Sequence, residues 1–206
     1  MKISIKIILA NFIIVGIAAA MLLQIFFDEV WLSMSKAAEE NMIDTANILA
    51  VFAAEDMTNN NIHDGRFVKA LGEISQREIS ANIWGVSKDR VEFRAYITDL
   101  NGKVIYDTAG EYEGQDFSQW NDVYHTLKGK YGARASPQTE EDHSSILFIA
   151  APIKKDGNLL GVLSVGKPTN TFQPFFESGK TTITNAAIML IGGSLMLGLF
   201  FSYRLT

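Results

Sequence analysis

The sequence has 206 residues, of which 48% are hydrophobic and 20% are charged, and its formal net charge is −5. It contains no cysteine, which excludes disulfides, thiolate metal sites and cysteine nucleophiles. Residues 1–27 and 181–206 hold three basic and no acidic side chains, which leaves 15 basic and 23 acidic residues between them. A central region that is acidic and has no basic runs argues against nucleic acid as a partner.

Residues 7–27 predict a first membrane helix. They form an uncharged apolar segment of 21 residues, and a helix of this length crosses a hydrocarbon core of about 30 Å. Lys2 and Lys6 with the alanines at 18–20 also fit a cleavable signal peptide. The apolar residues continue past these alanines to Phe27, however, which favours an uncleaved anchor.

Residues 181–203 predict a second membrane helix, whose core at 183–201 is also uncharged. The basic residues Lys2, Lys6 and Arg204 flank the two helices, which places both ends of the chain in the cytoplasm by the positive-inside rule. We therefore expect a cytoplasmic start (1–6), an extracytoplasmic domain (28–180) and the start of a cytoplasmic linker (204–206). In a Gram-negative cell this is an inner-membrane protein with a periplasmic domain.

The domain between these helices begins with helical patterns. Residues 28–57 contain no proline or glycine and repeat apolar residues at helical spacing, so they predict a long helix continuous with the first membrane helix. Three asparagines at 59–61 end it. A shorter helix is expected at 65–77, with Asp64 as its N-cap.

Strand patterns follow. A hairpin is expected about Asn101-Gly102, and a second one closes the domain. The expected elements are strands at 92–98 and 103–107, a helix at 117–128 capped by Asp116 or Ser118, an edge strand at 129–134, a polar loop at 137–143, and strands at 145–153 and 159–165. These elements predict an α+β fold in which the long N-terminal helix packs on one antiparallel sheet and leaves the other face free for a pocket.

Three segments carry a resemblance to a known family: YITDLNGKVIYDT (96–108), GQDFSQWNDVYHTLKGKYGAR (114–134) and SSILFIAAPIKKDGNLLGVLSVGKP (144–168). They resemble the PAS-like extracytoplasmic sensor called a Cache or PDC domain. Essentially the whole chain is similar to the input region of CreC-type membrane sensor histidine kinases. The resemblance implies a homodimeric receptor that controls a cytoplasmic kinase through a HAMP linker near Arg204, with a response regulator downstream. The kinase domains lie outside these 206 residues.

Catalytic and metal-binding patterns are missing from the sequence. His63, His125 and His143 are scattered without a zinc-hydrolase spacing. The acidic run at 140–142 lacks the spacing of an EF-hand and is typical of a solvated loop. We therefore expect no enzymatic activity, metal or cofactor in this segment.

Aromatic and basic residues suggest a ligand site. Aromatic walls with one or two convergent cations suit a small anion such as a carboxylate. The candidate residues are Trp84, Arg94, Tyr96, Tyr106, Trp120, Tyr124 and Arg134. Arg134 is the strongest, because it follows a flexible glycine on a strand. In the alternative interpretation, Trp120 and Tyr124 form the aromatic core and the two arginines pair with surface acids.

Three functions fit the sequence. The first is the sensor region of a two-component histidine kinase, which binds a small molecule or a protein. The second is the same sensor in a chemoreceptor or a cyclic-dinucleotide enzyme. The third is a stand-alone envelope protein, anchored by two helices, that acts by protein contact.

Overall fold

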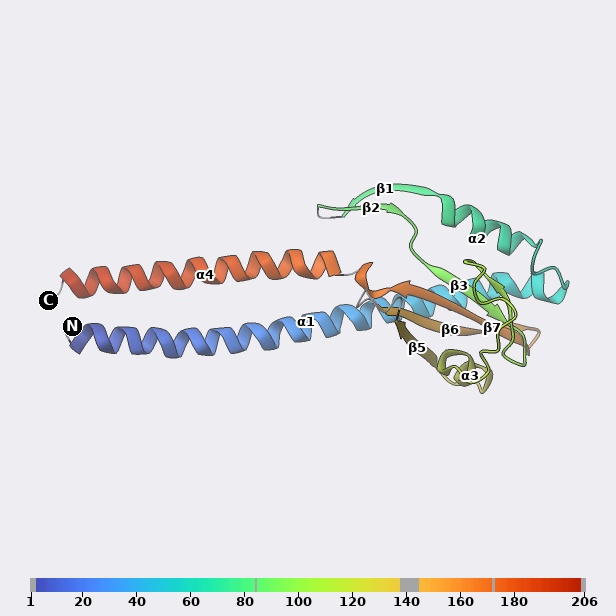
Figure 1. Ribbon diagram of the computed structural model, residues 1–206, viewed down its shortest axis with the longest axis horizontal. Coiled ribbons are helices and arrows are strands. Elements are labelled where there is room, and N and C mark those ends of the chain that lie inside the picture. Colours follow the sequence, from blue (N-terminus) through green and yellow to red (C-terminus); the bar gives the residue numbers. More distant parts are fainter. Residues whose placement is uncertain (1–2, 84, 138–144, 172, 205–206) are drawn as a thin grey trace. The chain divides into compact units, whose positions relative to one another are not determined.

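The computed structural model describes residues 3–83, 85–137, 145–171 and 173–204. The chain divides into two compact units: a sheet unit formed by residues 36–173, and a helical unit formed by residues 1–35 and 174–206. Helix α1 (Ile3–Thr58) contributes to both units, and nearly all of α4 (Gln173–Arg204) belongs to the helical unit (Figure 1).

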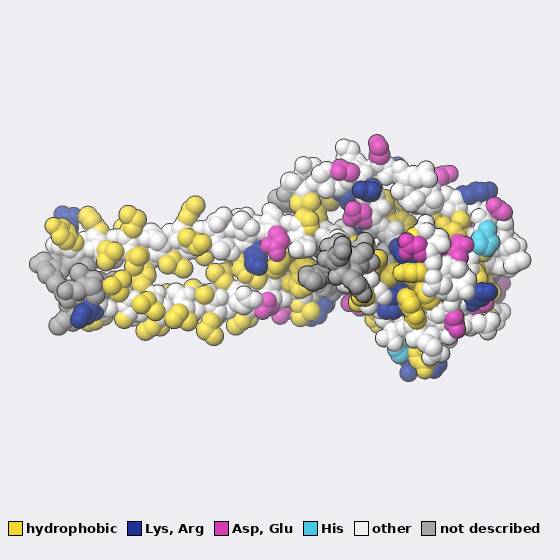
Figure 2. Space-filling view, viewed as in Figure 1, with side chains coloured by type: hydrophobic (Ala, Val, Ile, Leu, Met, Phe, Trp, Pro, Cys, Tyr) yellow, Lys and Arg dark blue, Asp and Glu magenta, His cyan; other side chains and the backbone are white. Residues whose placement is uncertain are grey.

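The helical unit contains the two segments predicted to cross a membrane. Both lie within α1 and α4, which are long and apolar enough to span a bilayer. Figure 2 shows hydrophobic side chains on the surface of both helices, and Leu22 and Met196 are 67% and 74% exposed. In the same unit the ring of Phe176 packs edge-on against Trp31, with 5.2 Å between the ring centroids. Exposed apolar surfaces of this kind suit lipid hydrocarbon.

The sheet unit is built on a five-stranded antiparallel sheet of order β4-β3-β7-β6-β5. Its strands are β3 (Arg94–Thr98), β4 (Val104–Asp107), β5 (Gly132–Pro137), β6 (Ser145–Lys155) and β7 (Asn158–Pro168). Asp156 and Gly157 join β6 to β7 with φ angles of 51° and 83°, which suit a tight hairpin turn. Both predicted hairpins are confirmed, and β5 is the predicted edge strand.

One face of the sheet packs against α1 and α2 (Arg66–Gln76). Ala46, Ala50 and Ala53 of α1 are fully buried there, and Phe67 and Leu71 extend the core from α2. A row of alanines permits close approach, because a methyl group adds little height above the helix backbone. The sequence therefore correctly predicts a long N-terminal helix packed on an antiparallel sheet.

The opposite face of the sheet is covered by α3 (Asn121–Leu127) and by the loop that precedes it. Tyr96 lies on this face, whereas its neighbours Ala95 and Ile97 belong to the α1 side, as the two-residue period of a strand requires. Aromatic side chains fill most of the space beneath α3. This face is therefore a second packed layer and not the free face expected from the sequence, because α3 and the loop before it cover it.

A two-stranded sheet of β1 (Glu78–Ile83) and β2 (Val86–Arg90) was not expected from the sequence. Residues Glu78–Ile83 of β1 do alternate polar and apolar side chains, with Ile79 and Ala81 half-buried, whereas β2 contains one apolar residue, Val86. The amide oxygen of Asn82 accepts a hydrogen bond of 2.8 Å from the Gly85 backbone N–H at its turn. This hydrogen bond stabilises the turn of a hairpin whose strands have no fully buried residue.

The predicted helix caps are wrong. Gly65, in place of Asp64, is the N-cap of α2, and the first turn is instead stabilised by the buried carboxylate of Asp56, which accepts a 2.8 Å hydrogen bond from the Phe67 N–H. Helix α3 begins at Asn121, after an N-cap at Trp120, because residues 117–120 form a turn. The predicted polar loop at 137–143 lies almost entirely outside the described residues.

We predict that Gly132→Ala destabilises the sheet unit by about 1–3 kcal/mol, because the added methyl group must displace backbone. A Cβ at this position would lie 2.1 Å from the carbonyl oxygen of Asp122 in α3. Gly72→Ala is the matched control: a Cβ there meets nothing within 4 Å inside helix α2, so we expect a gain of about 0.5–1 kcal/mol. Thermal unfolding followed by tryptophan fluorescence measures both. Equal effects of the two substitutions would contradict the tight β5–α3 contact.

Candidate functional site

The predicted ligand residues that meet in space lie on the α3 side of the sheet. We call this group the arginine–aromatic cluster. It consists of Tyr96 from β3, Phe117 and Trp120 from the loop before α3, Asp122 from α3, Arg134 from β5 and Phe148 from β6. Because β5 and β6 are paired with Arg134 opposite Phe148, the strand register itself places the cation beside an aromatic ring.

Arg134 lies between two aromatic faces. The central carbon of its guanidinium lies 3.9 Å from the ring centroid of Trp120 and 4.3 Å from that of Phe148. Trp120 is itself stacked on Phe117 at 3.7 Å. Only 10% of the Arg134 side chain is exposed. Stacking on aromatic faces stabilises a planar cation and fixes the orientation of its N–H groups.

Asp122 supplies the negative charge of the cluster and is fully buried. Its Oδ1 accepts a hydrogen bond of 3.1 Å from Nε of Arg134. Its Oδ2 accepts from the Tyr96 hydroxyl and, at 2.9 Å, from the Ser164 hydroxyl on β7. A buried carboxylate is tolerated only when it is paired and hydrogen-bonded, and Asp122 meets both conditions.

Tyr96 stays protonated in this environment. Burial and the neighbouring Asp122 carboxylate both raise the pKa of its hydroxyl well above the ordinary value. The hydroxyl therefore remains a donor to Asp122 throughout the physiological pH range. Its ring packs edge-on against Phe117, at 5.2 Å between centroids, so Tyr96 connects the polar and the aromatic parts of the cluster.

The Nη2 group of Arg134 can still donate hydrogen bonds. Its Nε is used by Asp122 and its Nη1 donates to Ser136, whereas Nη2 is buried and has no hydrogen-bond partner among the described residues. A buried donor without an acceptor is costly, and each such group in a folded protein requires an explanation. An anionic ligand would supply the missing acceptor.

Arg94 lies at the edge of this cluster and is held by other acids. Its guanidinium forms ion pairs of 2.6 Å with Asp107 and 2.8 Å with Glu111. It also covers the ring of Tyr112 at 3.6 Å. Burial opposes ionisation of Asp107, but hydrogen bonds from Arg94 and from backbone N–H groups outweigh it and hold the pKa of Asp107 below its usual value. Arg94 is therefore committed to fixing the loop after β4.

The other predicted residues lie elsewhere. Tyr106 packs against the core on the α1 side, on the face of the sheet opposite to Arg134. The Tyr124 hydroxyl bonds to Lys128 near the surface of α3. Trp84 lies outside the described residues. The structure thus brings together Tyr96, Trp120 and Arg134 from the predicted set.

The residue patterns in the sequence do not identify Asp122, Phe117 or Phe148 as members of the arginine–aromatic cluster. Asp122 stands in the GQDFSQWNDV segment, but nothing in that segment alone shows which strand its carboxylate faces. Phe117 and Phe148 read as ordinary core residues. Alternation along 145–153 would have placed Phe148 on the same face as its cross-strand partner Arg134, had the register been known. Among the described residues, no group of three or more histidines and acids is arranged to hold a metal ion.

No protein-family model matches the sequence. Known proteins resemble this chain both in sequence and in fold. The chain is 40% identical over 199 residues to sensor protein CreC of Escherichia coli (strain K12), which covers 96% of this chain and 42% of that protein. The chain thus spans less than half the length of this relative. The fold is similar to the sensor domain of the histidine kinase DctB of V. cholerae, with a TM-score of 0.50 and 16% identity over 72% of this chain and 56% of that one. The resemblance to CreC-type sensors and the α+β fold class are confirmed.

We predict that Asp122→Ala costs about 3–5 kcal/mol of unfolding free energy, because it leaves the Arg134 cation buried without its partner. The double variant Asp122→Ala/Arg134→Met should recover much of this loss, since neither charge then remains. Asp89→Ala is the control at an exposed acid, with an expected effect within about 0.5 kcal/mol. Chemical denaturation of the three variants measures these differences. A loss below about 1 kcal/mol in Asp122→Ala would contradict the central place of the buried ion pair.

Proposed function

We propose that this chain, whose sequence is of the CreC type, is the extracytoplasmic sensing and transmembrane signalling region of a two-component sensor histidine kinase. It binds a small anion, such as a carboxylate, and passes the signal to a cytoplasmic kinase that acts on a response regulator. The observation that carries the proposal is the buried guanidinium of Arg134, whose Nη2 has no acceptor among the described residues.

The chemistry of the arginine–aromatic cluster supports an anionic ligand. Asp122 neutralises the charge of Arg134 from the Nε side, so the cation is tolerated beneath α3. The opposite edge of the guanidinium keeps donors for a second acceptor, and charge-assisted hydrogen bonds from arginine to carboxylates are among the strongest in proteins. The rings of Trp120 and Phe148 restrict the guanidinium to one plane, which favours planar ligands.

The membrane topology belongs to the same proposal. Residues 7–27 and 181–203 cross the inner membrane, residues 1–6 and 204–206 lie in the cytoplasm, and residues 28–180 are periplasmic. Two apolar helices and the basic residues that flank them support this arrangement. The likeness to a sensor protein along 96% of the chain favours the kinase over the chemoreceptor, the cyclic-dinucleotide enzyme and the stand-alone envelope protein.

A homodimer formed through α1 completes the proposal. Ile48, Val51 and Phe52 are 57%, 72% and 65% exposed, although the neighbouring Ala50 and Ala53 are buried against the sheet. Three large apolar side chains on one exposed helical surface indicate a contact with another protein surface. A ligand acts only through its different affinity for two states, and a piston, rotation or tilt of α1 in the dimer provides such states.

We predict that Arg134→Met weakens binding of a small carboxylate at least tenfold, because it keeps the length of the side chain and removes every donor. Acetate, lactate, succinate and inorganic phosphate are the probes, and calorimetric titration of the whole chain in nanodiscs is the measurement. Arg90→Met, at an exposed arginine of β2, is the matched control and should bind as the parent does. Arg134→Lys, which keeps the charge and loses the planar fork, should also bind less tightly.

Two results would contradict the anion site. One is equal binding of a probe by the parent protein and Arg134→Met, with both shown by thermal unfolding to be folded. The other is a folded parent protein that binds none of the four probes.

We predict that Val51→Cys forms an intermolecular disulfide on mild oxidation, because this position lies on the exposed apolar surface of α1. The natural sequence has no cysteine, so each variant carries one thiol. Ala50→Cys is the control, since only 2% of Ala50 is exposed. Non-reducing electrophoresis measures the dimer, and equal crosslinking of both variants would contradict an interface on this surface.

The periplasmic location has a test of its own. A Lys69→Cys thiol, at an exposed position of α2 away from the proposed interface, should react with a membrane-impermeant maleimide in intact spheroplasts; protection until lysis would contradict the periplasmic location.

A further inference from the structure

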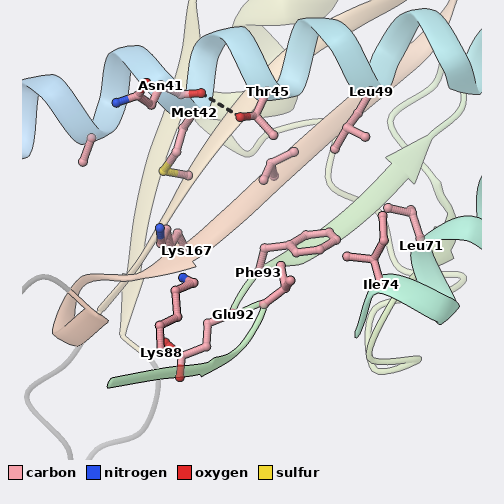
Figure 3. A pocket seen from close by; sticks show the side chains of 13 residues that line it. Asn41, Met42, Thr45, Leu49, Leu71, Ile74, Lys88, Glu92, Phe93 and Lys167 are labelled. Atoms are coloured by element: carbon pink, nitrogen blue, oxygen red, sulfur yellow. Dashed lines mark hydrogen bonds between the residues drawn. The ribbon is translucent and has the colours of Figure 1, made fainter. Parts of the chain in front are cut away.

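A cavity of about 460 Å³ lies on the α1 side of the sheet, between α1, α2, the β2 strand and β7 (Figure 3). Its apolar walls come from Met42 and Leu49 of α1, Leu71 of α2 and Phe93 before β3. This volume is typical of sites that hold a small molecule. The cavity is separate from the arginine–aromatic cluster, because the sheet lies between them.

The cavity has a polar end formed by two lysines. Lys88 enters it from β2 and Lys167 from β7, and Figure 3 shows both amino groups at the same end, away from Leu71 and Ile74. Glu92 also lines this end and is the one acidic residue among the described side chains that line the cavity. Among these described side chains, two cations and one carboxylate lie at one end of a mostly apolar space.

The electrostatics of Lys167 agree with this geometry. Burial is the largest influence and lowers the pKa of its ammonium group, and the nearby charge of Lys88 lowers it further, whereas Glu92 acts in the opposite direction. Two like charges facing one cavity repel each other. An anion placed between them would remove this repulsion and stabilise both ammonium groups.

We propose that this cavity is a second ligand site, which binds a small amphiphilic carboxylate with its head group at Lys88 and Lys167 and its short hydrocarbon chain against Met42, Leu49 and Phe93. The separation of charged and apolar ends matches such a molecule better than a fully polar anion, which would make no use of the apolar walls. Because α1 contributes a wall, an occupant touches the helix that continues into residues 7–27. The site is therefore placed to influence α1 independently of the arginine–aromatic cluster.

Photolabelling tests this site directly. The probe is a hexanoate that carries a diazirine near the end of its chain, added to the whole chain in phosphatidylcholine nanodiscs, and mass spectrometry maps the labelled peptides. We expect labels in the peptides that contain Met42 or Phe93. Unlabelled hexanoate should compete, whereas acetate and hexylamine should not, because the first lacks the chain and the second lacks the negative charge.

Matched variants separate this site from chance labelling. Lys88→Gln/Lys167→Gln should reduce the labelling at least fivefold, whereas Lys69→Gln, at an exposed lysine of α2 outside the cavity, should leave it unchanged. Ala38→Trp, which fills the cavity from α1, should reduce the labelling without removing either lysine.

The proposal is overturned if labelling is unchanged in the double variant, if hexylamine competes as well as hexanoate does, or if the labels lie on the α3 side of the sheet. Replacement of part of the phosphatidylcholine by phosphatidylglycerol distinguishes a free ligand from lipid. Loss of labelling with the anionic lipid would assign the cavity to a membrane lipid and reject the free carboxylate.

Discussion

The buried carboxylate of Asp122 is the interaction on which the α3 side of the molecule depends. It accepts hydrogen bonds from Tyr96 on β3, Ser164 on β7 and Arg134 on β5, so one side chain of α3 connects the helix to three strands. Without that acceptor, a tyrosine hydroxyl, a serine hydroxyl and a guanidinium would all be buried without a shared partner. The same carboxylate allows the cation of Arg134 to remain buried under α3.

The two faces of the sheet have different compositions and pack against different helices. The α1 side is lined by alanines of the helix and by aliphatic strand residues, which bring α1 close to the sheet. The α3 side is lined by aromatic rings around a buried ion pair. Because adjacent residues of one strand point to opposite faces, β7 contributes to both layers: Ser164 bonds to Asp122 on the α3 side, and Val165 packs in the core on the α1 side.

Sequence patterns predicted those parts of the structure that have a strong period. The long helix, both hairpins and the two apolar segments follow from apolar spacing and turn residues, whereas the role of Arg134 as a ligand contact stays a prediction. The β1–β2 hairpin is absent from the prediction although β1 alternates polar and apolar residues, because β2 has a single apolar residue and carries no matching strand pattern. Asp122 and Phe148 were missed for another reason: their roles depend on strand register and on which way α3 faces, and both are decided by long-range contacts. The position of Tyr106 also depends on strand register. The turn at Asp99–Lys103 pairs Tyr106 with Ile97, which places Tyr106 on the α1 side of the sheet.

The composition of α1 has a mechanical consequence. Its 56 residues contain no proline and only one glycine, at position 16, so nothing in the backbone provides a hinge along a length of about 84 Å. Sharp kinks in helices occur mostly at proline, at glycine or serine pairs and at π-bulges. Because every residue of α1 can donate its backbone N–H, a bend in this helix would have to break or lengthen backbone hydrogen bonds.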